Sequence, residues 1–182
     1  MQMYFIAVVL PRVLDEKILR YKKQMAERYG CKVGLKSPAH ITIIPPFWTE
    51  PGKEEQLKND IESISAPFQP FTISTNHFSA FKPRTIFVAV SESEELKSLK
   101  KASDNFFLTN DYKIKIESRP FHPHITIATR DLHKKDFAGA WPGFEKEEFR
   151  EEFEVNGLSL LRHNGRTWDV IFTSTFNGQR IC

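Results

Sequence analysis

The chain has 182 residues, of which 40% are hydrophobic and 27% are charged. This length is enough for one domain with a substantial core, and the composition argues against both a disordered chain and a membrane protein. A formal net charge of +3 is too small to identify a nucleic-acid-binding protein, although it does not disfavour an anionic ligand.

The first third of the chain predicts a strand and two helices. The apolar run at residues 3–10 is too short to span a bilayer and is typical of a strand buried on both faces. Apolar residues then recur at steps of four, three and four, which predicts a helix over residues 15–29 with Gly30 as its left-handed cap. A second helical pattern lies between Gly52 and Pro67.

The rest of the chain predicts more strands than helices. A capping-box pattern at residues 91–94 predicts the start of a third helix, and a short fourth helix is expected around residues 132–141. Strands are expected at residues 71–78, 85–90, 113–117, 123–128, 153–161 and 168–176. Because many strands adjoin hairpin-like turns, we predict an α+β fold with antiparallel sheets.

One tetrapeptide, His-Ile-Thr-Ile, occurs twice in the chain. It begins at His40 and again at His124, 84 positions later (124 − 40), each time on a strand-like run with a proline just upstream. Side chains alternate along a strand, so each histidine shares a face with its threonine, Thr42 or Thr126, and the isoleucines point to the other face. The repeat predicts two strands with one polar and one apolar face.

These residue types suit phosphodiester chemistry if two similar halves bring the motifs together, with His40 opposite His124 and the threonines between them. One neutral imidazole can accept a proton from the attacking oxygen while the other, protonated, donates one to the leaving oxygen. The threonine hydroxyls can donate hydrogen bonds to the non-bridging oxygens. This scheme needs no metal ion, and the sequence does not assign acid and base.

The paired motifs closely resemble those of the 2H phosphoesterase superfamily, in particular its 2′-5′ RNA ligase and cyclic phosphodiesterase group. The likeness extends over almost the whole chain, and it includes the opening strand at residues 4–11 and the strand at residues 83–88. It implies a single domain over residues 1–182, made of two pseudo-symmetric lobes with two antiparallel sheets around a central cleft and helices outside. It also implies metal-independent action on 2′,3′-cyclic phosphates or 2′-5′ linkages, with RNA ends or small nucleotides as substrates.

Some further residues are candidates for binding. Arg130 resembles the arginine that often follows the second motif in this family, and its planar fork suits a phosphate. A basic rim for RNA could be formed by Lys82, Arg84, Arg119 and Arg162, although such residues more commonly serve solubility. A stacking surface for a base could be formed by Phe47 and Trp48, although core packing is the commoner use of aromatic residues.

Two other functions compete with this reading. An RNA-end or nucleotide-binding module on the same fold would keep the pocket without chemistry, but it would not need two proton carriers. A histidine-based metal hydrolase is less favoured because each histidine is paired with threonine and not with a carboxylate. The cysteines, Cys31 and Cys182, match no metal spacing or disulfide framework, which fits the reducing cytoplasm. We expect a cytoplasmic protein that uses no cofactor, and we favour a monomer.

Overall fold

The computed structural model describes residues 1–182 apart from 111, 113, 115–118 and 179–182. The chain begins with β1 (Gln2–Val9), whose central residues are buried, as the apolar run predicts. It continues in α1 (Arg12–Tyr29), which ends at Gly30 with φ of 70°. A positive φ suits glycine because it has no Cβ, so the predicted cap is confirmed.

The remaining elements follow the predicted order closely. The helices are η1 (Val33–Lys36), η2 (Pro51–Lys53), α2 (Glu54–Ser65), α3 (Glu94–Thr109) and α4 (Lys134–Phe144). The strands are β2 (His40–Thr49), β3 (Phe71–Phe81), β4 (Thr85–Val90), β5 (His124–Ala128), β6 (Glu152–Val155), β7 (Gly157–His163) and β8 (Trp168–Thr175). The strand expected at 113–117 falls largely outside the described residues.

Two local predictions differ from the structure. The helix cap of α3 is Ser93, whose side chain accepts a hydrogen bond from the backbone N–H of Leu96, so the cap lies two residues beyond Ser91. The single strand expected at residues 153–161 is two strands separated by Asn156. β6 pairs with β3 at one edge of the sheet while β7 pairs with β1 in the other half, so the chain passes from one half of the sheet to the other at this residue.

Among the described residues, eight strands pair antiparallel in the order β6-β3-β4-β5-β2-β1-β7-β8, which confirms the α+β antiparallel fold class. This order contains two four-stranded halves that meet at β2 and β5, so together they form one curled sheet. In each half a strand is followed by a helix and then by a motif strand: β1-α1-β2 in one, β4-α3-β5 in the other. The two motif strands are therefore neighbours at the centre.

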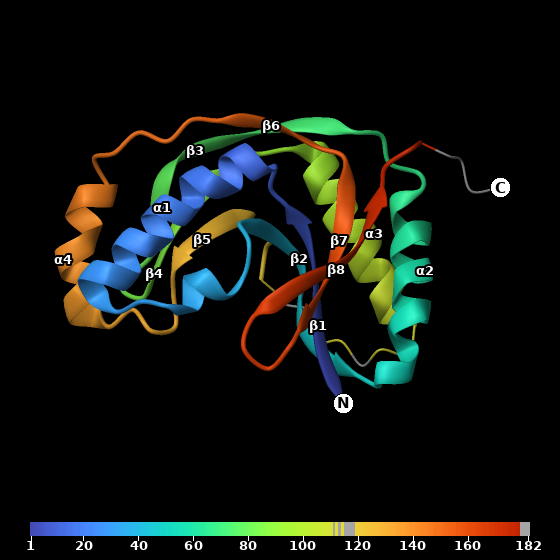
Figure 1. Ribbon diagram of the computed structural model, residues 1–182. Coiled ribbons are helices and arrows are strands. Elements are labelled where there is room, and N and C mark those ends of the chain that lie inside the picture. The colour runs from blue at the N-terminus through green and yellow to red at the C-terminus, as the bar shows by residue number, and fades with distance from the viewer. Residues whose placement is uncertain (111, 113, 115–118, 179–182) are drawn as a thin grey trace.

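The main core lies on one face of this sheet. Helices α1 to α4 each contribute buried residues to it, including Ile18 of α1, Ile61 of α2, Leu99 of α3 and Phe137 of α4. Helices α1 and α4 lie towards one end of the sheet and α2 and α3 towards the other (Figure 1). Each motif strand contacts the helix of the other half, since α1 packs on β5 and α3 packs on β2.

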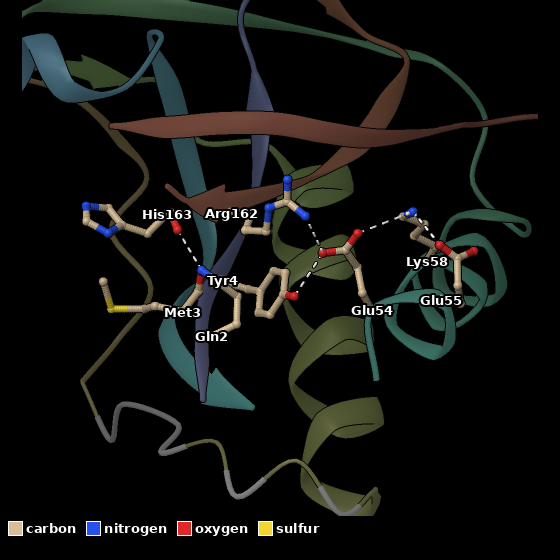
Figure 2. A network of polar contacts seen from close by, with 8 residues as sticks. All are labelled: Gln2, Met3, Tyr4, Glu54, Glu55, Lys58, Arg162 and His163. Atoms are coloured by element: carbon tan, nitrogen blue, oxygen red, sulfur yellow. Dashed lines mark hydrogen bonds and ion pairs between the residues drawn. The ribbon is translucent and has the colours of Figure 1, made fainter. Parts of the chain in front are cut away.

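A network of polar contacts attaches the start of α2 to the sheet (Figure 2). Glu54 accepts hydrogen bonds from the Tyr4 hydroxyl at 2.9 Å and from the Arg162 guanidinium at 3.0 Å, and Lys58 lies 3.6 Å from its carboxylate. Arg162 is thus engaged on the helix-bearing side of the sheet, which makes it a poor member of a basic rim for RNA. Within the described part of the chain, no helix combines the length and apolarity needed to cross a membrane.

Candidate functional site

The two histidine motifs lie side by side at the junction of the two halves. β2 and β5 pair in antiparallel register with Ile41 opposite Ile125. Residue numbers run in opposite directions along such a pair, so His40 lies opposite Thr126 and Thr42 lies opposite His124. The histidines are therefore diagonal neighbours, and not directly opposite as the sequence suggested. Diagonal positions across a strand pair are about 7–8 Å apart at the backbone, so the two histidines occupy neighbouring positions on one face of the sheet.

The burial pattern of the motif strands follows the predicted alternation. Ile41 and Ile43, like Ile125 and Ile127, are fully buried in the main core beneath α1 and α3. The two histidines and the two threonines are half-buried on the opposite face of the sheet. The isoleucines thus fix each strand in the core while the polar side chains remain accessible.

The two histidine rings are held by equivalent hydrogen bonds. Nδ1 of His40 lies 2.7 Å from the carbonyl oxygen of Pro38, and Nδ1 of His124 lies 2.7 Å from the carbonyl oxygen of His122. A carbonyl only accepts hydrogen bonds, so Nδ1 must carry the proton in both rings. Nε2 of each ring is therefore the atom that can accept or donate a proton in a reaction.

Each ring also rests on a buried phenylalanine of the neighbouring strand. The ring centroids of His40 and Phe5 are 4.9 Å apart, and those of His124 and Phe87 are 5.0 Å apart. Phe5 belongs to β1 and Phe87 to β4, which occupy equivalent places in the two halves. The duplicated sequence therefore produces a duplicated setting, in which ring position and tautomer are fixed in the same way.

The electrostatic setting of His40 favours the neutral ring. Desolvation lowers its pKa from 6.5 to about 4, although its hydrogen bond to Pro38 opposes this change. The Lys22 ammonium and, when it is protonated, the His124 ring lower the pKa of His40 further, because a nearby cation disfavours a second one. Near neutral pH His40 is consequently unprotonated at Nε2 and able to accept a proton.

The other residues that the sequence suggested for binding lie outside the two histidine motifs. Arg130 is exposed in the turn after β5, beyond the end of the strand opposite to His124, so its contact with a phosphate stays a prediction. Phe47 is buried in the core, whereas Trp48 is 56% exposed. Lys82 lies over the ring of Trp141.

Three supporting residues were missed by the sequence reasoning. Phe5 and Phe87 pack against the histidine rings. The alternation of side chains along their strands indicates these contacts, but only once the order of the strands in the sheet is known. Lys22 is only 3% exposed, and it occupies a place on the buried stripe of α1 with Ile18 and Met25. A lysine at a core position of an amphipathic helix was the available signal.

The described residues contain no group of three or more His, Cys, Asp or Glu side chains placed to hold a metal ion. A hollow of about 630 Å³ lies away from the motifs, between α1 and the segment before β6, and its lining carries charges of both signs: Lys17, Arg20, Tyr21, Gln24, Glu148, Phe149, Arg150 and Glu151.

Two relatives of similar sequence are named as phosphoesterases. A provisionally named phosphoesterase of Bacillus mycoides (strain KBAB4) is 28% identical over 168 residues, which cover 90% of this chain and 91% of that protein. Another from Oceanobacillus iheyensis is 26% identical over 174 residues, covering 93% and 95% of the two chains.

Solved structures share the fold. TT0787 of Thermus thermophilus matches with a TM-score of 0.70 at 19% identity, over 99% of this chain and 100% of that one. E. coli LigT complexed with 3′-AMP matches with a TM-score of 0.66 at 18% identity, over 97% and 98%. The family model of the 2′-5′ RNA ligase superfamily matches residues 10–167. This match extends over most of the chain, so the protein belongs to the 2′-5′ RNA ligase superfamily of 2H phosphoesterases.

Proposed function

We propose that this protein is a metal-independent phosphodiesterase that opens 2′,3′-cyclic phosphates of RNA ends or nucleotides, with 2′-5′ RNA ligase activity when a 5′-hydroxyl takes the place of water as the nucleophile. The observation that carries the proposal is the repeated setting of His40 and His124, each with Nδ1 bound to a backbone carbonyl and Nε2 as the atom for proton transfer. We further propose that residues 1–182 act as one cytoplasmic domain of two pseudo-symmetric lobes, each supplying one motif.

In this mechanism a phosphate binds between the diagonal histidines. One imidazole removes a proton from water as its oxygen forms a bond to phosphorus, and the other donates a proton to the ribose oxygen as its bond to phosphorus breaks. Thr42 and Thr126 donate hydrogen bonds to the non-bridging oxygens, whose negative charge increases in the transition state. The products are a phosphomonoester and a free hydroxyl, and by likeness to the family we infer a 2′-phosphate.

Related structures support a nucleotide as the ligand. E. coli LigT has been solved with 3′-AMP, with NADP+ and with ATP. These complexes belong to a protein that shares the fold, and we extend the ligand class to this chain because its paired histidines and threonines suit a nucleotide phosphate. A nucleotide or RNA-end binding module without chemistry is the alternative.

A substrate panel tests the proposal. The purified protein, treated with EDTA, is incubated with adenosine 2′,3′-cyclic phosphate, a 2′-5′-linked dinucleotide and an ADP-ribose cyclic phosphate, and products are followed by ³¹P NMR. A His40→Ala/His124→Ala double variant purified in parallel controls for contaminating enzymes. We expect turnover of at least one substrate by the wild type alone.

Other results would reject the proposal in distinct ways. A folded protein that turned over none of these substrates would contradict it, and tight binding without product would favour the binding module. Activity abolished by EDTA and restored by a divalent cation would favour a metal hydrolase.

A further inference from the structure

The two motif histidines have equivalent hydrogen bonds, but the rings beside them differ. His40 packs on Phe5, which is 3% exposed. His124 packs on the similarly buried Phe87 and also on Phe81 of β3, whose ring centroid lies 5.2 Å from its own. Phe81 is 45% exposed, so an aromatic surface that is open to solvent adjoins His124.

The ring of Phe81 is held by three neighbouring rings. It lies against Phe87, with centroids 4.5 Å apart and planes inclined by 40°, and it meets His124 edge-on at 87°. The ring of His122, an exposed residue, lies 5.3 Å from that of Phe81. Phe87 supports the ring and the two histidines border it, so the exposed part of Phe81 lies directly beside a motif histidine.

The side of the site that belongs to His40 has no equivalent surface. The position that corresponds to His122 is occupied by Pro38, which has no aromatic ring. Trp168 of β8 is partly buried and packs edge-on to Phe5 at 4.7 Å, and among the described residues no ring contact joins it to His40. The duplicated site is therefore symmetric in its imidazoles but not in its aromatic neighbours.

Trp48 is a second exposed aromatic side chain, but it lies far from the histidines. It is eight positions along β2 from His40 (48 − 40), which at about 3.3 Å per residue places it roughly 26 Å away along the strand. A nucleoside does not reach that far from its own phosphate. Phe81 is thus the exposed aromatic residue within reach of a nucleotide bound at the motifs.

From this arrangement we propose that the nucleobase of the substrate stacks on Phe81, so that the nucleoside lies on the His124 side of the phosphate. The inference rests on the proposed phosphodiesterase function and narrows its substrates to cyclic phosphates that carry a base. Bases of single-stranded RNA ends stack on aromatic side chains, and every base has a flat face that can do so.

The charges near Phe81 in the chain suit an anionic ligand. Exposed Lys82 and Arg84 follow it in the turn between β3 and β4. The sequence from residue 71 to residue 91, which contains both of these strands, has no Asp or Glu. This segment therefore offers cations and no carboxylate to the phosphates of a nucleotide, and phosphate contacts of this kind position a nucleic acid without reading its sequence.

The stacking role is tested with a pair of substrates that differ in the base. Adenosine 2′,3′-cyclic phosphate is compared with the 2′,3′-cyclic phosphate of 1-O-methylribose, which has the same reacting group but no base. Phe81→Leu keeps an apolar side chain but loses the ring. We expect it to raise KM roughly tenfold for the adenosine compound, with little change in kcat, and to leave KM for the other compound unchanged. Phe81→Trp should restore the low KM.

Two further replacements by leucine complete the comparison. Phe106→Leu removes a ring from α3, which packs on the other face of the sheet, and Trp48→Leu removes the second exposed aromatic side chain. We expect neither to change the ratio of the two KM values. A loss of rate in Phe81→Leu that is equal for both substrates would show that Phe81 only supports the His124 ring, and it would overturn the proposal. So would a changed ratio in Trp48→Leu but not in Phe81→Leu.

A binding titration separates this inference from the proposed activity. Adenosine 2′-phosphate or ribose 5-phosphate is added to the full chain, and the ring signals of Phe81 are followed by NMR, assigned by their loss in Phe81→Leu. We expect the adenosine compound to shift these signals through the ring current of the base, and ribose 5-phosphate to leave them in place. A protein that shows this shift but cleaves no phosphodiester would reject the proposed activity and retain the stacking site. Cleavage without the shift would overturn the stacking site alone, and the absence of both would reject both.

Discussion

His40 and His124 are fixed by hydrogen bonds of equal length, 2.7 Å from Nδ1 to the carbonyl oxygen two residues earlier in the chain. The upstream proline of each motif lies within this three-residue unit, as Pro38 in one and Pro123 in the other. The sequence repeat is therefore also a repeated way of orienting an imidazole, with the same nitrogen, Nδ1, bound to the backbone in both copies.

Removing either histidine should abolish most of the activity. We expect His40→Ala and His124→Ala each to lower kcat by about 10²–10⁴-fold, because each removes one proton-transfer partner. The double variant should be little worse than the single ones, since residues that act as a unit do not contribute additively. Steady-state rates on the best substrate of the panel check this, with exposed His133→Ala as the control. Near-normal rates in either single variant would refute the pairing.

Replacing the motif threonines by valine should impair the chemical step. Valine keeps the shape of threonine but cannot donate a hydrogen bond, so Thr42→Val and Thr126→Val should each lower kcat by about 10²-fold with a smaller effect on KM. Thr72→Val, at an exposed position of β3, serves as the control. If kcat were unchanged and KM alone rose, the hydroxyls would serve ground-state binding only.

Gly34 should not tolerate a side chain. A Cβ at this position would lie 2.4 Å from the backbone oxygen of Ile127 in β5, so backbone must move to admit it. We expect Gly34→Ala to lower the free energy of unfolding by about 1–3 kcal/mol and to reduce turnover by displacing the strand of the second motif. Gly52→Ala is the matched control, because a Cβ there meets nothing within 4 Å. Urea denaturation of both variants checks this, and equal stability would contradict it.

The contacts of the Glu54 carboxylate should stabilise the fold at neutral pH, and this stabilisation should be lost at acidic pH. Burial alone would raise its pKa, but hydrogen bonds from Tyr4 and Arg162, together with the charges of Arg162 and Lys58, lower the pKa below its ordinary 4.5. A carboxyl group with a lower pKa in the folded state stabilises above its unfolded pKa, and this contribution is lost as pH falls through the folded value.

We therefore expect Glu54→Gln to lower the free energy of unfolding by about 1 kcal/mol at pH 7, a modest value because Arg162 is partly exposed. The difference from wild type should shrink below pH 4.5. Glu55→Gln, which removes a more exposed neighbour bound to Lys58, should have little effect at either pH. A gap that widened in acid would show that the sign of this contribution is wrong.

Local patterns predicted the parts of the fold that depend on periodicity. The apolar spacing of α1 and the alternation within β2 and β5 are set by one buried face, and they are visible in any short window of sequence. The separation of β6 from β7 at Asn156 was not predictable in this way, because both segments have strand-like patterns and they differ in the strands with which they pair. Choice of partner depends on the whole sheet.

The candidate site shows the same division. Side chains alternate between the two faces of a strand, so His40 and Thr42 were expected on the same face. The diagonal placement of the histidines was missed, because it depends on the register of Ile41 against Ile125, which no local pattern specifies. Lys22 was missed since a single lysine in a helix is normally solvated, and its burial depends on packing against residues far along the chain.

The crossed packing of α1 on β5 and α3 on β2 makes the two repeats mutually dependent. A fragment that ended before α3 would keep the strand of His40 but lose the helix that covers its apolar side. Neither repeat is therefore a self-sufficient building block, although each carries its own histidine. We therefore expect a change that displaces the helix of one repeat to displace the imidazole of the other as well.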